Sequence, residues 1–161
     1  MKKVWIILTT VMLVLMLTLL SMPITAVSAE PNQPIECVVD IEFNPPIDPL
    51  DPRCWHGTVS GCSIAGEIEF CELPAELVGR NKFFFETFTI NPSVGGEIRG
   101  VDEGVWNFST FKFRANGYVT ETSPEWEDMV GFKFHEMGTT SNPADGFPVT
   151  AYNTKMTLHQ P

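Results

Sequence analysis

The stretch "GFKFHEMG" at residues 131–138 places His135 beside Glu136, and such a pair can serve in acid–base catalysis or as two ligands of a metal ion. In a β-strand, however, successive side chains point to opposite faces. Glu136 then shares a face with Phe134, whereas His135 shares the other face with Lys133. We therefore predict that His135 and Glu136 are not a catalytic dyad, and that Glu136 is the residue facing an apolar interior.

The same alternation assigns two further acids to apolar faces. Glu86 shares a face with Phe88 in "KFFFETFTI", and Asp102 shares one with Trp106 in "GEIRGVDEGVWNF". A carboxyl group among aromatic rings has a raised pKa, so it can act as a general acid or donate a hydrogen bond in a ligand cavity. Glu86, Asp102 and Glu136 are therefore the candidate site residues. The alternatives are that water solvates them at strand ends or barrel rims, or that basic residues pair with them.

Other chemistries lack the spacing that they require. The histidines His56, His135 and His159 contain no i, i+2 or i, i+4 pair, so no metal site is predicted. The chain has no G-x-S-x-G motif for a serine nucleophile. We predict no cofactor. Asn107 begins "NFS", which is an N-glycosylation acceptor only in a host that performs this modification.

The first 29 residues have the pattern of a secretory signal peptide. Lys2 and Lys3 precede a charge-free apolar run, and small residues at Val27 and Ala29 fit a cleavage site. The alternative is an uncleaved N-terminal anchor, because the run is nearly long enough to span a bilayer. We therefore expect a secreted or extracytoplasmic protein with no other membrane segment. Its net charge of −10 makes nucleic acid an unsuitable partner.

Four cysteines fall early in the exported part, and an even number in such a protein predicts disulfides. They are Cys37, Cys54, Cys62 and Cys71. If Gly66 opens a two-residue hairpin turn, Cys62 faces Cys71 and Cys37 is left for Cys54. If a single strand instead runs through this point, Cys62 and Cys71 lie on opposite faces. We give a slight preference to the first pairing.

Beyond the signal peptide, the composition indicates two regions. Residues 30–54 are rich in proline, which predicts an extended arm that the cysteines tie to the domain. Residues 55–161 are rich in Phe, Val, Thr and Gly, and turn signals interrupt them every eight to twelve residues or so. This pattern predicts an all-β fold, a small antiparallel barrel of about eight strands, with a β-sandwich as the alternative.

Two stretches in the second half of the chain suggest a family. "FKFRANGYVTE" and "VGFKFHEMGTT", which follow "GGEIRGVDEGVWN", resemble the strand–glycine–strand texture of allene oxide cyclase-like and dirigent-like proteins. The similarity covers about residues 80–160. It implies an eight-stranded calycin-like barrel with an apolar central cavity. The cyclases act on an unsaturated fatty epoxide and dirigent proteins steer phenoxy-radical coupling, but none of their functional residues can be matched here.

Three functions remain open on these grounds. The first is an exported, non-catalytic barrel that binds a small apolar ligand in its interior, because the apolar strand faces carry a few acids. The second is an isomerase or cyclase of the allene oxide cyclase type that uses an interior carboxyl group such as Glu86. The third is a structural or adhesive cell-surface protein, whose interior would be filled. The sequence decides neither enzymatic activity nor the oligomeric state.

Overall fold

A computed structural model describes residues 33–45, 53–73 and 75–161. The chain divides into two units, residues 1–31 and 32–161, and everything below concerns the second. The predicted signal peptide therefore lies outside the described residues. Among the described residues, no helix is both long and apolar enough to cross a membrane.

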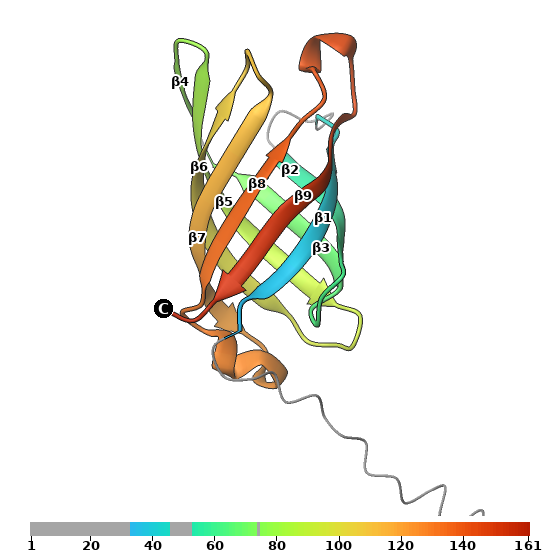
Figure 1. The fold of residues 1–161 in the computed structure, drawn as a ribbon, viewed down its shortest axis with the longest axis vertical. Coiled ribbons are helices and arrows are strands. Elements are labelled where there is room, and N and C mark those ends of the chain that lie inside the picture. Colours follow the sequence, from blue (N-terminus) through green and yellow to red (C-terminus); the bar gives the residue numbers. More distant parts are fainter. Residues whose placement is uncertain (1–32, 46–52, 74) are drawn as a thin grey trace, which may run out of the picture. The chain divides into compact units, whose positions relative to one another are not determined.

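The second unit is a closed antiparallel barrel of eight strands, joined mostly in up-and-down order (Figure 1). The barrel strands are β1 (Ile35–Phe43), β2 (Arg53–Ser60), β3 (Gly66–Glu72), β5 (Asn81–Pro92), β6 (Ile98–Asn107), β7 (Lys112–Thr122), β8 (Lys133–Thr139) and β9 (Val149–His159). Pairing of β9 with β1 and of β3 with β5 closes the cylinder. The short β4 (Glu76–Val78) lies outside it, on the first residues of β5. The predicted barrel is confirmed.

The proline-rich region contributes a barrel strand. Residues 30–54 were expected to form an arm over the barrel, but β1 lies within them and pairs along its length with β2 and β9. The reason is the alternation in "CVVDIEF", which buries Cys37, Val39 and Ile41 on one side. Prolines flank this run without entering it, so they do not interrupt the hydrogen-bonded ladder.

The disulfides join Cys37 to Cys62 and Cys54 to Cys71, so the preferred pairing of Cys62 with Cys71 was wrong. The turn between β2 and β3 spans residues 61–65 rather than Gly66 and its successor. In the resulting register Cys54 stands directly opposite Cys71. Cys62 is left in the turn, where it meets Cys37 on β1. Disulfides are typical of an oxidising, extracytoplasmic compartment.

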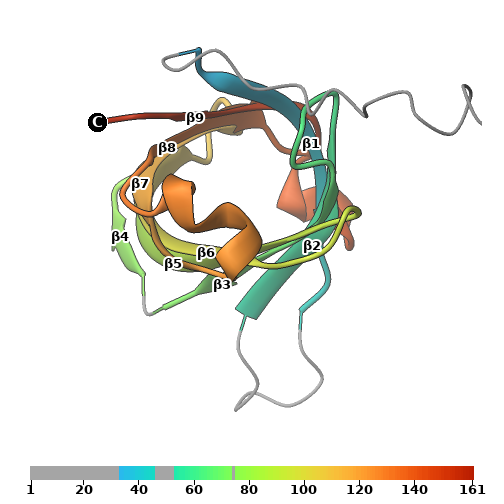
Figure 2. The ribbon, with the colours of Figure 1, turned by 90° about the horizontal axis from the view of Figure 1, so that it is seen from below.

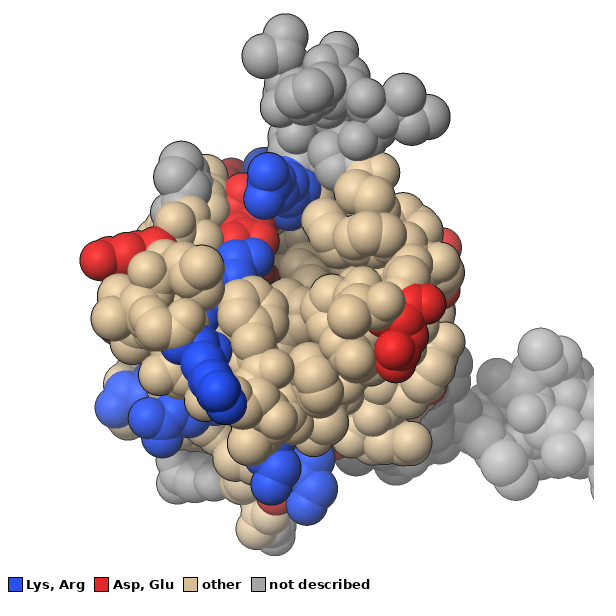
Figure 3. All heavy atoms as spheres, turned by 90° about the horizontal axis from the view of Figure 1, so that it is seen from above, with Lys and Arg blue, Asp and Glu red and all other residues tan. Residues whose placement is uncertain are grey.

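The two ends of the barrel differ. At the lower end, where β7 finishes, the 3-10 helix η1 (Pro124–Met129) lies across the mouth (Figure 2). Trp126 Nε1 donates a 3.0 Å hydrogen bond to the Gly95 carbonyl, and Met129 is buried. At the upper end, a second short 3-10 helix, η2 (Pro143–Asp145), connects β8 to β9. The upper end is hollowed near its centre (Figure 3).

Three phenylalanine rings pack together inside the barrel. The ring centroids of Phe88 and Phe134 are 4.5 Å apart, and Phe70 lies 6.2–6.3 Å from both. Gly100 makes room for this packing, because a Cβ atom there would overlap the Phe88 ring. All three phenylalanines are nearly inaccessible to solvent. The middle of the barrel is therefore filled, and the cavity described below lies above this packing.

Candidate functional site

The three candidate acids all lie inside the barrel, as the strand alternation predicts. Glu86 on β5 and Asp102 on β6 are direct partners across the sheet. Glu136 extends inward from β8, two strands beyond β6. These residues are 8%, 2% and 4% exposed, respectively. Charged groups are seldom buried to this degree without a partner, so the environment of each carboxyl group decides what it can do.

Two charged residues that the sequence reasoning missed belong to the same region. Glu72 on β3 is the register partner of Glu86, and its Oε2 atom accepts a 2.6 Å hydrogen bond from Lys82 Nζ. The Lys82 ammonium group also lies 5.7 Å from the ring centroid of Trp106. The alternation that placed Glu86 inside also places Lys82 on that face, since the two are four residues apart. That signal was available in the sequence.

Several polar atoms in the interior have no hydrogen-bond partner among the described residues. They include both carboxyl oxygens of Asp102, Oε1 of Glu136, Nε1 of Trp106 and Oγ1 of Thr154. Buried polar atoms are nearly always paired, and those that are not usually meet water or a ligand. The oxygens of Asp102 and Glu136 therefore lack the hydrogen bonds that buried carboxyl groups ordinarily make.

Burial raises the pKa of all three acids, and repulsion from neighbouring acids adds to this at Glu86 and Glu136. Desolvation is the main cause at Glu86, followed by the charges of Asp102, Glu136 and Glu72, and Lys82 only partly opposes them. Desolvation raises the pKa of Asp102 to about 7. The pKa of Glu136 is raised well above its ordinary value by burial and then by Asp102. Near neutral pH the cluster therefore retains protons, and its carboxyl groups can donate as well as accept hydrogen bonds.

A small cavity reaches this cluster from the upper end. Its volume is about 30 Å³, and its walls combine Glu86, Glu136 and Lys82 with the aromatic rings of Trp55, Phe84, Trp106 and Phe113. Phe70 forms part of the wall, so the cavity stops above the aromatic packing described above. A space of this size holds about one water molecule or a functional group of similar bulk. It admits the end of a ligand rather than a whole one.

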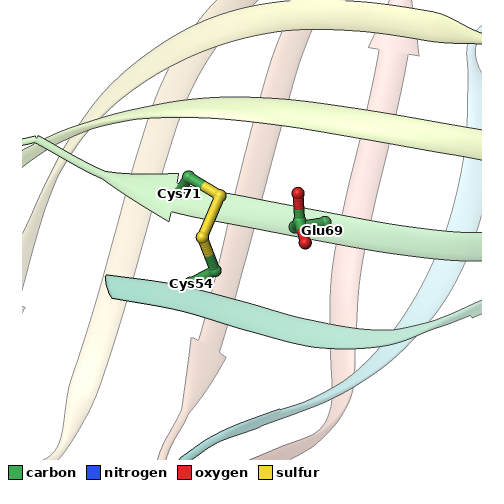
Figure 4. A group of neighbouring side chains, drawn as sticks. All are labelled: Cys54, Glu69 and Cys71. Atoms are coloured by element: carbon green, nitrogen blue, oxygen red, sulfur yellow. A yellow bond between two sulfur atoms is a disulfide. The ribbon is translucent and has the colours of Figure 1, made fainter. Parts of the chain in front are cut away.

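One cluster has metal-like spacing but lies elsewhere. Potential ligand atoms of Cys54, Glu69 and Cys71 all lie within 4.8 Å of one another, and no other such group of three occurs in the described part of the chain (Figure 4). The two sulfurs are joined in a disulfide, so neither is the thiolate that binds metal. The Glu69 carboxylate pairs instead with His56 Nδ1 at 3.1 Å. The same spacing limit shows that Glu86, Asp102 and Glu136 are too far apart to share one ion as they stand.

The remaining sequence candidates lie away from the cavity. His135 is on the outer face of β8, where Nδ1 lies 2.7 Å from Asn116 Oδ1. The separation of His135 from Glu136 that the alternation predicts is thus observed. Asn107 ends β6, and its Nδ2 atom donates a 2.8 Å hydrogen bond to Asn81 Oδ1. A glycan on Asn107 would use that nitrogen and weaken this contact.

Comparisons with protein-family models, with curated proteins and with solved structures found no significant match. The function is therefore argued from the geometry and chemistry of the barrel interior.

Proposed function

We propose that this protein is an exported, non-catalytic barrel that binds one end of a small molecule in the upper cavity. A polar group of the ligand meets the carboxyl groups of Glu86 and Glu136, and its apolar body lies against Trp55 and Trp106. One observation carries the proposal: Glu136 lines an aromatic cavity, and its buried Oε1 atom has no hydrogen-bond partner among the described residues. Such an atom gains a hydrogen bond when a ligand enters, which favours binding.

The aromatic walls supply the apolar part of the affinity. Trp55 and Trp106 are both buried and pack edge to face, with ring centroids 5.8 Å apart. Phe43 extends this wall at 4.9 Å from Trp55. Rings held in this way present apolar area at little further loss of side-chain entropy. The cavity therefore suits an amphiphilic molecule with a small polar end.

Tryptophan fluorescence and thermal unfolding test this proposal together, because Trp55 and Trp106 line the cavity. We would titrate the protein with matched six-carbon alcohols, ketones, amines and carboxylic acids. A ligand at 100 times its Kd stabilises the folded state by about 2.7 kcal/mol. The variant Glu136→Gln should bind the preferred class at least tenfold more weakly. Glu103→Gln is the control, because Glu103 is on β6 beside Asp102 but is exposed on the outer face.

Two outcomes would contradict the proposal. One is that no class binds to the wild-type protein. The other is that Glu136→Gln binds the preferred class as tightly as Glu103→Gln does.

A second candidate function is an isomerase or cyclase of the allene oxide cyclase type. The observation in its favour is the pKa of about 7 at Asp102 beside a cavity-lining Glu86, because proton transfer is most efficient when a group's pKa is near the working pH. Glu86→Gln would then abolish turnover of an unsaturated fatty epoxide while leaving the melting temperature unchanged or higher. Turnover that survives this substitution would exclude Glu86 as the general acid.

A further inference from the structure

Acidic side chains outnumber basic ones around the upper cavity. Four carboxyl groups, those of Glu72, Glu86, Asp102 and Glu136, act on one another there. Among the described residues, Lys82 is the one basic residue that lines the cavity, and it already pairs with Glu72. A second anion would meet like charge in a medium of low dielectric constant, where repulsion is strong. A cation would instead find carboxyl groups that become its counter-charge when they lose a proton.

Lys82 shows how an ammonium group is bound beside this cavity. Lys82 Nζ lies 2.6 Å from a Glu72 carboxylate oxygen and 5.7 Å from the ring centroid of Trp106. A carboxylate and an aromatic face are the two partners that ammonium groups prefer in proteins. The same two kinds of partner line the rest of the cavity, where Glu86 and Glu136 occur together with Trp55 and Phe113. Of these residues, Glu136 has an Oε1 atom with no hydrogen-bond partner among the described residues.

We propose that the ligand group received between Glu86 and Glu136 is a primary ammonium group, carried on an alkyl or aryl body that lies against Trp55 and Trp106. This inference rests on the proposed function, because it specifies the polar end of the ligand that the cavity takes. A primary ammonium group has three donors and no acceptor, which matches carboxyl oxygens that need donors.

The size of the cavity separates ammonium groups from one another. A volume of about 30 Å³ accepts a group as large as one water molecule. A primary ammonium group is of that size, whereas a trimethylammonium group is several times larger. Aromatic rings alone would favour the quaternary cation. The small volume bounded by Phe70, Glu86 and Glu136 reverses that preference.

Binding of a cation is coupled to release of a proton. The charged or titratable groups facing the region are Glu72 from β3, Lys82 and Glu86 from β5, Asp102 from β6 and Glu136 from β8, with Arg53 of β2 opposite Glu72 at the rim. The inward residues of β1, β7 and β9 at this level are apolar or hydroxyl-bearing. Because burial holds protons on Glu86 and Glu136, a bound ammonium group must displace one. Affinity therefore rises with pH, by up to about tenfold per pH unit for each proton released.

Isothermal titration with three probes of one shape tests the proposal on the full exported protein. The probes are 2-phenylethylammonium, 2-phenylethanol and 3-phenylpropionate, measured at pH 5, 6.5 and 8. We expect the ammonium probe to bind at least tenfold more tightly than the alcohol at pH 8, and the propionate to bind weakest. Its affinity should fall at least tenfold from pH 8 to pH 5. Phenyltrimethylammonium should bind at least tenfold more weakly than the primary ammonium probe.

Variants locate the site. Glu136→Gln and Glu86→Gln should each weaken the ammonium probe at least tenfold, whereas Glu103→Gln should leave it unchanged. Lys82→Met should strengthen it severalfold, because Glu72 loses its own ammonium partner. The comparisons among probes use the wild-type protein alone, so they decide the question even if a variant fails to fold.

Each contrary result has a definite meaning. Equal affinity for the alcohol and the ammonium probe overturns the assignment of a cation, and so does unchanged ammonium binding in both Glu136→Gln and Glu86→Gln. Tight alcohol binding that Glu136→Gln abolishes would overturn this inference while supporting the proposed function. Failure of all the probes to bind contradicts both.

Discussion

Replacing Asp102 by asparagine should make the stability of the barrel less sensitive to pH. Asp102 ionises near pH 3.8 when the chain is unfolded, whereas burial raises its pKa to about 7 in the folded barrel. The folded state therefore favours the protonated form. The stabilisation that this form provides is fully present below pH 3.8 and is lost as the pH rises toward 7.

The size of this effect follows from the two pKa values of Asp102. Between pH 5 and pH 7 the unfolded chain has released this proton, whereas the folded chain retains it. The free energy of unfolding therefore falls by about 1.4 kcal/mol per pH unit, or about 3 kcal/mol over this range. Asparagine has nearly the same shape and does not ionise. The substitution also removes a charge that raises the pKa of Glu86 and of Glu136. This second effect likewise makes stability less sensitive to pH.

Urea unfolding, followed by tryptophan fluorescence with the disulfides intact, measures the effect at pH 5, 6.5 and 8. We expect the free energy of unfolding of the wild-type protein to fall over this range, and that of Asp102→Asn to fall by about 3 kcal/mol less. Glu103→Gln, which removes an exposed acid from the same strand, should follow the wild-type profile. Parallel profiles for wild type and Asp102→Asn would refute the claim that burial holds a proton on Asp102.

The remaining predictions concern the parts of the fold that position the site. Gly100→Ala should lower the free energy of unfolding by about 1–3 kcal/mol, because the new Cβ meets the Phe88 ring and the Tyr118 carbonyl oxygen; an unchanged midpoint in urea would argue against that packing. Peptide mapping without reduction should recover Cys37 with Cys62 and Cys54 with Cys71, and a Cys62–Cys71 peptide would contradict the fold of the β2–β3 hairpin. The double variant Cys37→Ser/Cys62→Ser should lose about 3 kcal/mol of stability, which a denaturant titration measures. His135→Ala should alter neither ligand binding nor its pH dependence, since His135 lies on the outer wall; a changed pH profile would count against its exclusion from the site.

The sequence predicted well those features that depend on a period of two. The inward positions of Glu86, Asp102 and Glu136 follow from their neighbours at i±2, because a strand leaves no other orientation. The assignment of His135 to the outer wall follows in the same way. The barrel was the preferred prediction and is confirmed, but the spacing of the strands alone also permits a β-sandwich.

Other features depend on information that no single strand contains. The pairing of Cys54 with Cys71 depends on the residue at which the β2–β3 turn begins. If the turn begins at a different residue, every pair of residues that face each other across β2 and β3 changes. The approach of Glu136 to Asp102 depends on the stagger of β6, β7 and β8 around the barrel. The Lys82–Glu72 pair arises because the first residues of β5 pair with β4, whereas the rest of β5 pairs with β3. The bulk of Phe70, Phe88 and Phe134, which fills the middle of the barrel, could be judged only once these strands were placed.

The central claim is that the barrel holds protonated carboxyl groups in its interior near neutral pH, where a ligand can reach them. Carbon-13 NMR of the side-chain carboxyl groups, titrated from pH 3 to pH 9, measures this most directly. Glu86→Gln, Asp102→Asn and Glu136→Gln each identify one resonance by its loss. We predict that Asp102 titrates near pH 7 and that Glu86 and Glu136 titrate well above the ordinary range for glutamate. Titration of all three below about pH 5, as in solvated acids, would contradict the claim.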